Sequence, residues 1–230
     1  MSNRACSVPV KLAVLSLSIV ALGAAGCDGG SGGAEKYFPM KIGATWNYAV
    51  TPASGVPYTD VKQNTASSPS TLTQTYTASI GASSTASYAM DANGISITGG
   101  TSTVSNGGTS TASQFSYAPP CLLLPSNTTP GFSTSSTSTK TTVQGSTNTT
   151  YTVAVAVTID GLESVTVPAG TFSALKVTMA ITSTNALTGS VSNSFNVQWR
   201  APGIGSVKTV DEDSLQAVQQ TWELTSCNIP

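Results

Sequence analysis

The 230-residue chain has no histidine, and charged residues make up only 8% of it. A typical soluble domain carries about 25% charged residues. Because no imidazole is available, the Ser-His-Asp and Cys-His catalytic systems and the HExxH zinc site are excluded. Nine Lys and Arg residues against ten Asp and Glu residues give a formal net charge of −1. Nucleic-acid binding needs a field of positive charge over the phosphates, so we expect no nucleic-acid partner.

Signals for other chemistry are weak. The Gly-rich stretches lack the GxxxxGKS and GxGxxG patterns of phosphate-binding loops. Asp160 and Glu163 flank an expected turn, where solvent exposure suits them better than a paired catalytic role. Residues 211–213 form an acidic run without EF-hand spacing. We therefore predict a non-enzymatic protein with no catalytic residue, metal site or cofactor. A hydrolase with an unfamiliar carboxylate site is the remaining alternative.

The first 26 residues have the layout of a secretory signal. Arg4 and Lys11 form a short basic region, and residues 12–25 are predominantly apolar. A membrane-spanning helix needs about 20 apolar residues, so this run is too short to remain as an anchor. Small residues at positions 24–26 then precede Cys27. We predict that residues 1–26 are a cleaved signal peptide.

The small-small-Cys ending of this segment resembles the lipobox of bacterial lipoproteins. The match is good at Ala25, Gly26 and Cys27, whereas the family prefers Leu where this chain has Ala24. The resemblance implies that Cys27 carries diacylglycerol and an acylated amine, with residues 27–34 as a flexible tether. The protein would then lie in the bacterial cell envelope, anchored by lipid to the outer or the inner membrane. An ordinary signal peptide with an incidental cysteine is the alternative.

Two cysteines remain for the folded domain. Cys6 leaves with the signal peptide and Cys27 is assigned to the lipid, which leaves Cys121 and Cys227. In an oxidising envelope compartment, a leftover pair favours a disulfide. We predict a bridge between Cys121 and Cys227, with two separate thiols as the alternative.

Beyond residue 34 the sequence alternates with a period of two and shows no convincing amphipathic helix. Asp160-Gly161 and Pro168-Ala169-Gly170 are expected to form turns between strands. Apolar side chains recur at every second position in four segments, residues 151–159, 175–181, 195–199 and 218–224.

The chain contains 34 Ser and 35 Thr residues, which supply the polar face of such strands. Threonine favours an extended backbone because it is β-branched, and its uncharged hydroxyl hydrates the solvent-facing side of the strands. We predict an all-β fold over residues 35–230, a curved antiparallel meander sheet or half-barrel of roughly ten strands. Little helix is expected apart from the signal segment. Residues 134–150 are either a hydroxyl-rich strand pair or a mobile segment.

Three segments in order resemble one group of bacterial envelope proteins, and a fourth does so weakly. They are residues 37–48 (YFPMKIGATWNY), 165–177 (VTVPAGTFSALKV), 199–208 (WRAPGIGSVK) and, weakly, 119–125 (PPCLLLP). The group is that of the TapB-like lipoproteins, whose fold is similar to the half-barrel of LolA/LolB-type lipoprotein carriers. The chain departs from the group at Phe132, near which a tryptophan is expected.

We expect a lipid-anchored envelope protein that binds an apolar ligand in the concavity of its sheet or a surface-assembly partner. The alternative is a structural or adhesive surface lipoprotein with a packed core and no ligand cavity. The side chains inside the sheet distinguish ligand binding from a purely structural or adhesive function. A core filled by Trp46, Phe172, Phe195, Trp199 and Trp222 would exclude ligand binding inside the sheet.

Overall fold

The computed structural model describes residues 32–106 and 109–230. The predicted signal peptide, Cys27 and most of the tether lie outside these residues, as do Gly107 and Gly108. In the described part, the only helix is a single turn, α1 (Gly32–Glu35). No helix there has the length and hydrophobicity needed to cross a membrane.

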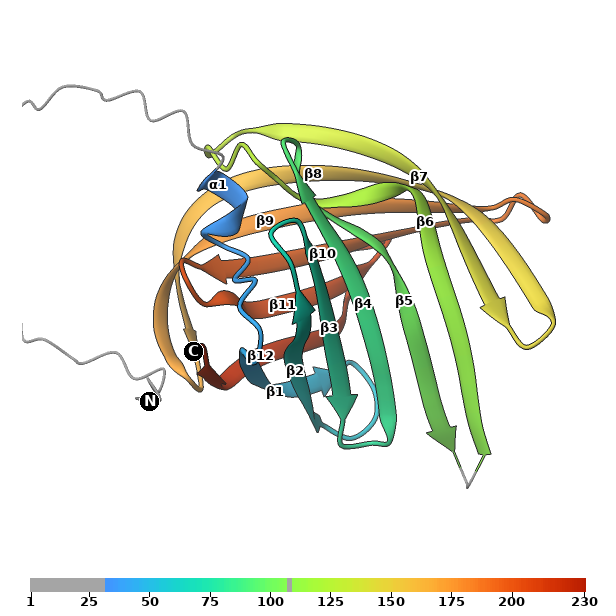
Figure 1. Ribbon diagram of the computed structural model, residues 1–230, viewed down its shortest axis with the longest axis horizontal. Coiled ribbons are helices and arrows are strands. Elements are labelled where there is room, and N and C mark those ends of the chain that lie inside the picture. The colour runs from blue at the N-terminus through green and yellow to red at the C-terminus, as the bar shows by residue number, and fades with distance from the viewer. Residues whose placement is uncertain (1–31, 107–108) are drawn as a thin grey trace, which may run out of the picture.

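Twelve antiparallel strands follow α1 in the described residues, and each pairs with the next along the chain (Figure 1). The predicted all-β meander is therefore confirmed. The strands are β1 (Thr45–Pro52), β2 (Tyr58–Ser67), β3 (Thr71–Ala78), β4 (Ala82–Asp91), β5 (Gly94–Asn106), β6 (Thr109–Pro125), β7 (Ser133–Gln144), β8 (Thr147–Val167), β9 (Gly170–Asn185), β10 (Val191–Ala201), β11 (Gly205–Asp213) and β12 (Val218–Asn228).

The sheet curves further than the expected half-barrel, because β1 pairs with β12 and closes a barrel. This ladder runs from Thr45 opposite Asn228 to Pro52 opposite Gln220. Closure leaves neither terminal strand with a row of unpaired backbone groups. The first and last strands of the chain are thus neighbours.

Alternation places the apolar faces of β8 and β9 inside the barrel, as predicted. Val153, Val155, Val157 and Ile159 of β8 are at most 4% exposed. They pack with Leu175, Val177 and Met179 of β9 in one hydrophobic cluster. Threonine and alanine occupy the intervening positions of β8, and Lys176 and Thr178 those of β9. The pattern follows from the strand period of two.

Strand β8 decides two predictions made from the sequence. The turn predicted at Asp160-Gly161 is wrong, because β8 continues through both residues to Val167. Gly161 has a φ of +137° at an irregularity in the pairing with β9, so the glycine serves a bulge there. Residues 134–150, left open by the sequence, lie in the paired strands β7 and β8 and their connection.

The structure does not support the predicted disulfide. Cys121 lies on β6 in the cluster around β8 and β9, whereas Cys227 lies on β12 in a second cluster. These strands are separated by half the circumference of the barrel. A disulfide needs Cα atoms within about 7 Å of each other, which opposite walls do not provide. No disulfide joins the two sulfurs.

The segment between α1 and β1 is anchored across the end of the barrel where β10 passes into β11. Tyr37 and Phe38 are buried there. Gly203 N–H, in the β10–β11 turn, donates to the carbonyl of Lys36 at 2.7 Å. On the opposite side, the side-chain Nδ2 of Asn64 donates to the carbonyl oxygen of Pro39 at 3.0 Å. These contacts place Phe38 in the interior.

Candidate functional site

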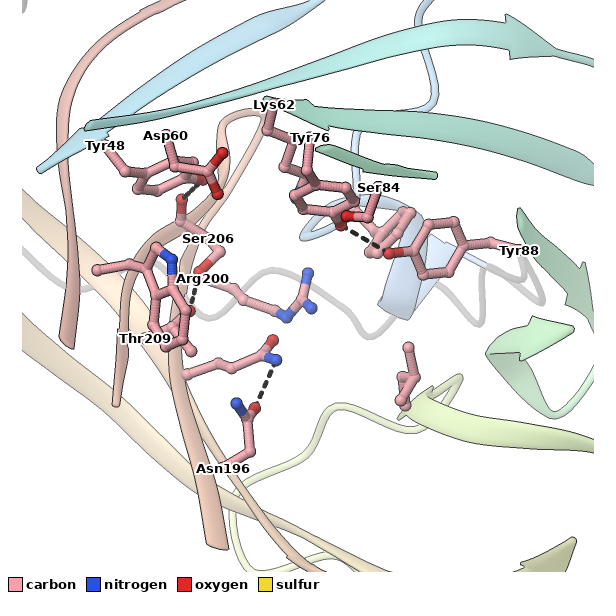
Figure 2. A pocket seen from close by; sticks show the side chains of 14 residues that line it. Tyr48, Asp60, Lys62, Tyr76, Ser84, Tyr88, Asn196, Arg200, Ser206 and Thr209 are labelled. Carbon is pink, nitrogen blue, oxygen red and sulfur yellow. Dashed lines mark hydrogen bonds between the residues drawn. The ribbon is translucent and has the colours of Figure 1, made fainter. Parts of the chain in front are cut away.

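A cavity of about 350 Å³ lies inside the barrel next to Phe38. Side chains from eight strands and from the segment before β1 surround it, and Figure 2 shows their arrangement. The lining is mixed, with aromatic rings, hydroxyls, amides and three groups that carry charge. Its members are Phe38, Tyr48, Asp60, Lys62, Tyr76, Ser84, Tyr88, Leu123, Asn196, Gln198, Arg200, Ser206, Thr209 and Trp222.

Strand β10 presents its polar face to this cavity, through Asn196, Gln198 and Arg200. The sequence pattern favoured the other face, with Phe195 and Trp199 inside. That expectation is wrong for Trp199, whose indole Nε1 donates to the Glu163 carboxylate in an exposed contact. The pairing of β10 with β9 and β11 sets the face that points inward.

Arg200 is the most deeply buried charged residue lining the cavity, at 5% exposure. Its guanidinium carbon lies 5.1 Å from the centre of the Phe38 ring, and its Nη1 donates weakly to the carbonyl of Tyr37 at 3.4 Å. Its Nε is buried and has no hydrogen-bond partner among the described residues. Burial lowers the pKa of Arg200, although a guanidinium stays protonated at neutral pH.

Lys62 of β2 is a second basic residue that lines the cavity, and aromatic rings surround its amine. Its Nζ lies 5.1 Å from the ring centre of Trp46 and 5.9 Å from those of Phe38 and Tyr76. Burial, with a smaller contribution from Arg200, lowers the pKa of Lys62 to about 7. The ammonium form is held by ring faces rather than by a carboxylate.

Neither cation belongs to an ion pair in the described part of the chain, where the pairs are Lys176–Glu163 and Lys208–Glu223. Asp60 is the third charged group of the lining, and burial raises its pKa. The Oδ1 of Asp60 and the Oε1 of Gln198 are both buried without a partner among these residues. The cavity thus offers unused donors and unused acceptors.

A chain of hydrogen bonds along β2, β3 and β4 leads to the cavity. Gln74 Nε2 donates to Asn64 Oδ1 at 2.7 Å, and the hydroxyl of Tyr76 donates to Gln74 Oε1 at 3.0 Å. The hydroxyls of Tyr76 and Tyr88 are 2.8 Å apart. Because the Tyr76 hydroxyl already donates its only proton to the hydrogen bond with Gln74, Tyr88 is the donor in the bond between the two tyrosines. Burial raises the pKa of both tyrosines.

A second cavity of about 590 Å³ adjoins the first and shares Leu123, Asn196 and Gln198 with it. Met179 and Ile181 of β9 give it an apolar wall. Its other side carries the acidic end of β11, residues 211–213. Together the two cavities form an interior space with a polar part near Arg200 and an apolar wall farther along.

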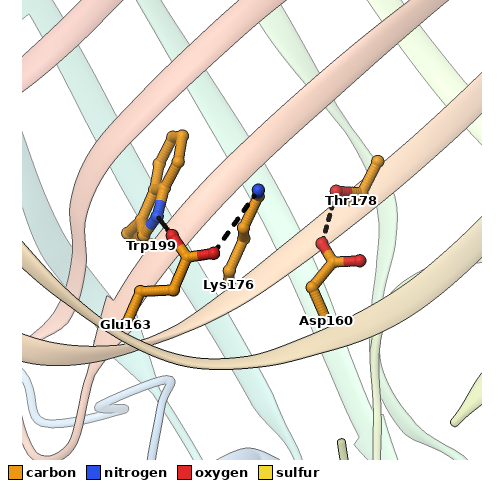
Figure 3. A network of polar contacts seen from close by, with 5 residues as sticks. All are labelled: Asp160, Glu163, Lys176, Thr178 and Trp199. Carbon is orange, nitrogen blue, oxygen red and sulfur yellow. Dashed lines mark hydrogen bonds and ion pairs between the residues drawn. The ribbon is translucent and has the colours of Figure 1, made fainter. Parts of the chain in front are cut away.

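Asp160 and Glu163, the two carboxylates expected beside a turn, lie apart from the cavity in a separate network (Figure 3). Glu163 Oε1 is 3.5 Å from Lys176 Nζ, and Asp160 Oδ2 accepts a hydrogen bond from Thr178 at 2.6 Å. Each carboxylate has its own partner. In the described residues, no group of three or more Cys, Asp or Glu side chains is placed to hold a metal ion.

Comparisons with known proteins agree with this architecture. Residues 118–224, from within β6 to β12, match the sequence profile of the DUF3108-like family. The fold is similar to that of a "putative lipoprotein" from Parabacteroides distasonis, with a TM-score of 0.51 and 16% identity over 83% of this chain and 97% of that one.

A further solved structure is that of a "putative exported protein with YmcC-like fold" from Bacteroides fragilis. Its TM-score is 0.49 and its identity 15%, over 83% of this chain and 98% of that one. None of the curated proteins matches the chain. The Parabacteroides structure therefore shows a shared fold, and it is the fold of a protein named as a lipoprotein.

Proposed function

We propose that the chain is a lipid-anchored, non-enzymatic protein of the bacterial cell envelope that binds an amphiphilic ligand inside its barrel. The interior cavity of about 350 Å³ carries this proposal. Ligand sites are typically concave spaces of about 300–1,000 Å³ with a few placed polar groups. The sequence predicted an apolar ligand, but the mixed lining suits a molecule that has one polar and one apolar end.

The aromatic residues that would have filled a packed core support this proposal by their positions. Trp46 and Phe172 are buried, but Trp199 points to the outer network and Trp222 lines the cavity. Phe195 is only partly buried. Of the five residues expected in the packed core of the alternative, a structural surface lipoprotein, three are thus only partly buried, although Trp199 and Trp222 still pack against the cluster that contains Trp46.

The lipid anchor rests on the lipobox resemblance at Cys27 and on the likeness to a protein named as a lipoprotein. The closer kinship to TapB-like lipoproteins, and through them to LolA/LolB-type carriers, stays a prediction. Mass spectrometry of the N-terminal peptide from the membrane fraction tests the anchor. We expect Cys27 to carry diacylglycerol, and an unmodified Cys27 would contradict the anchor.

Native mass spectrometry of protein extracted in mild detergent tests the ligand. We expect a bound small molecule in the wild-type protein and its loss in Ser84→Phe, because Ser84 lines the cavity. Thr85→Phe is the matched control, since the Thr85 hydroxyl lies in an exposed contact with Thr101. Wild-type protein that is folded yet never carries a ligand would overturn the binding function.

A second candidate function is contact with a partner protein at one rim of the barrel. In a meander, the connections after odd-numbered strands lie at the same end, and Leu187, Leu215 and Val56 lie on three of them. They are 93%, 86% and 81% exposed. Exposed apolar residues gathered in one place are typical of interaction sites.

Site-specific photo-crosslinking tests this rim. A crosslinker at Leu187 is expected to capture a discrete envelope protein in cells. The control position is Ile42, which is 58% exposed and precedes β1 at the other end of the barrel. Equal capture from both positions would contradict a partner site at the rim.

A further inference from the structure

We infer that Arg200 and Lys62 form an oxyanion-binding site, which holds the carboxylate or phosphate head group of the ligand. The inference rests on the proposed function, because it names the chemistry of the ligand's polar end. Both residues line the same cavity, and Figure 2 shows the Arg200 guanidinium extending into it.

Arg200 lacks the partner that a buried guanidinium needs. A buried charge is costly unless it is paired and hydrogen-bonded. Arg200 has only the 3.4 Å contact with the Tyr37 carbonyl and the face of Phe38, while its buried Nε has no partner among the described residues. A planar guanidinium with unused donors matches the geometry of a carboxylate or phosphate.

Lys62 adds a second unused donor group to the same cavity. It makes no hydrogen bond or ion pair with the described residues, and both it and Arg200 approach the ring of Phe38. The hydroxyl protons of Tyr48 and Tyr76 are already used in hydrogen bonds, so these tyrosines are not free to donate to an anion. Tyr48 donates to the carbonyl of Ser206 at 2.8 Å, and Tyr76 donates within the chain of hydrogen bonds. The two cations are therefore the groups open to an anion.

The charge of the lining also favours an anion. The cavity holds two basic side chains and one acidic side chain, Asp60, whereas the whole chain carries a net charge of −1. The orphan acceptors Asp60 Oδ1 and Gln198 Oε1 suit a hydroxyl beside the anionic group, or water. The adjoining cavity offers an apolar wall of Leu123, Met179 and Ile181 to the rest of the ligand, and its other side carries the acidic residues 211–213.

Ligand titration followed by native mass spectrometry of the full lipidated protein tests this inference. The probes are decanoate, decyl phosphate and the neutral monodecanoylglycerol. We expect each anionic amphiphile to bind at least about 10-fold more tightly than the neutral one, because charge-assisted hydrogen bonds are the strong ones. Lys62→Met and Arg200→Met are each expected to weaken anion binding by roughly 10- to 100-fold and to leave the neutral amphiphile unchanged.

Lys176→Met is the matched control, because it removes one lysine charge from the outer network. It is expected to bind all three amphiphiles as the wild-type protein does. If Arg200→Met fails to fold, Lys62→Met still tests the site, since Lys62 makes no hydrogen bond that its loss would break. Acetate and inorganic phosphate are added as competitors, so that a free anion can be distinguished from a lipid head group.

The outcomes distinguish failure of the oxyanion site from failure of amphiphile binding. Equal binding of anionic and neutral amphiphiles, or unchanged anion binding in Lys62→Met, would overturn the oxyanion site and leave amphiphile binding intact. Displacement of decyl phosphate by equimolar inorganic phosphate would support the oxyanion site and overturn the amphiphilic ligand. Folded protein that binds none of the probes would overturn both.

Discussion

The indole Nε1 of Trp46 donates a hydrogen bond to the backbone carbonyl of Ile204 at 2.6 Å, across 158 residues of chain. Trp46 is 1% exposed and lies on β1, and Ile204 lies in the β10–β11 turn. This bond joins two of the sequence segments that resemble TapB-like lipoproteins. Phe172 and Val167 of a third such segment pack in the same cluster as Trp46. These segments therefore build one end of the barrel together.

Trp46→Phe is expected to lower the free energy of unfolding by about 2–3 kcal/mol, because it leaves the Ile204 carbonyl without its donor and removes buried ring area. Urea unfolding followed by circular dichroism measures the change. Trp199→Phe is the control, because it breaks an exposed hydrogen bond to Glu163 and is expected to cost less than about 1 kcal/mol. Equal losses in the two variants would refute a structural role for the buried bond.

Gly94→Ala is expected to cost at least about 3 kcal/mol or to prevent folding. Gly94 has a φ of +133°, and a Cβ there would lie 2.1 Å from the carbonyl oxygen of Leu124 on β6. Gly131→Ala is the control, because Gly131 also has a positive φ, +85°, but has no atom within 4 Å of its Cβ position. Its cost is expected to be about 1–2 kcal/mol. Thermal unfolding compares the two, and similar costs would contradict the close approach of β5 to β6.

Gln74→Leu is expected to destabilise the barrel by about 2–4 kcal/mol, because it removes the donor to Asn64 Oδ1 and the acceptor of the Tyr76 hydroxyl. Tyr88→Phe removes only the end of this chain and is expected to cost about 1 kcal/mol. Guanidinium unfolding gives both values. A Tyr88→Phe variant as unstable as Gln74→Leu would contradict the central position of Gln74 in this chain of hydrogen bonds.

Lys62 makes the stability of the protein depend on pH. Its pKa is about 7 in the folded chain, against about 10.4 for an unfolded lysine. The unfolded state therefore binds more protons between these values, and the contribution of Lys62 to stability rises as pH increases through that window. Arg200, Asp60 and Tyr76 line the cavity with Lys62. Burial is the largest cause of its lowered pKa, Arg200 lowers the pKa further, and Asp60 raises it.

The measurement is the free energy of unfolding between pH 6.5 and 9.5 for wild-type protein and Lys62→Met. We expect the deficit of the wild-type protein relative to Lys62→Met to be largest near pH 6.5 and to shrink as pH rises. Subtracting the variant cancels other titrating groups, such as the buried Cys121 thiol, whose pKa is raised. A difference that does not change with pH would contradict the lowered pKa of Lys62.

Strand faces could be read from the sequence where one side of a strand is continuously apolar. The valines of β8 and the Leu175–Met179 stretch of β9 were assigned to the interior correctly, because a period of two with one apolar face has a single stable orientation. The turn at Pro168-Ala169-Gly170 was likewise predictable, since proline fixes φ and glycine can adopt a positive φ, here +132° at Gly170. The turn expected at Asp160-Gly161 failed because a glycine suits a bulge as well as a turn.

The cavity itself could not be predicted in this way. Lys62 and Asp60 lie on β2, which has no continuous apolar face, and the inward side of β10 is its polar one. A shift of one residue in register turns every side chain of a strand to the other face. Register on β10 is set by its ladders with β9 and β11, and closure is set by the pairing of β1 with β12. These contacts join distant parts of the chain, so they alone bring Arg200 and Lys62 to one cavity.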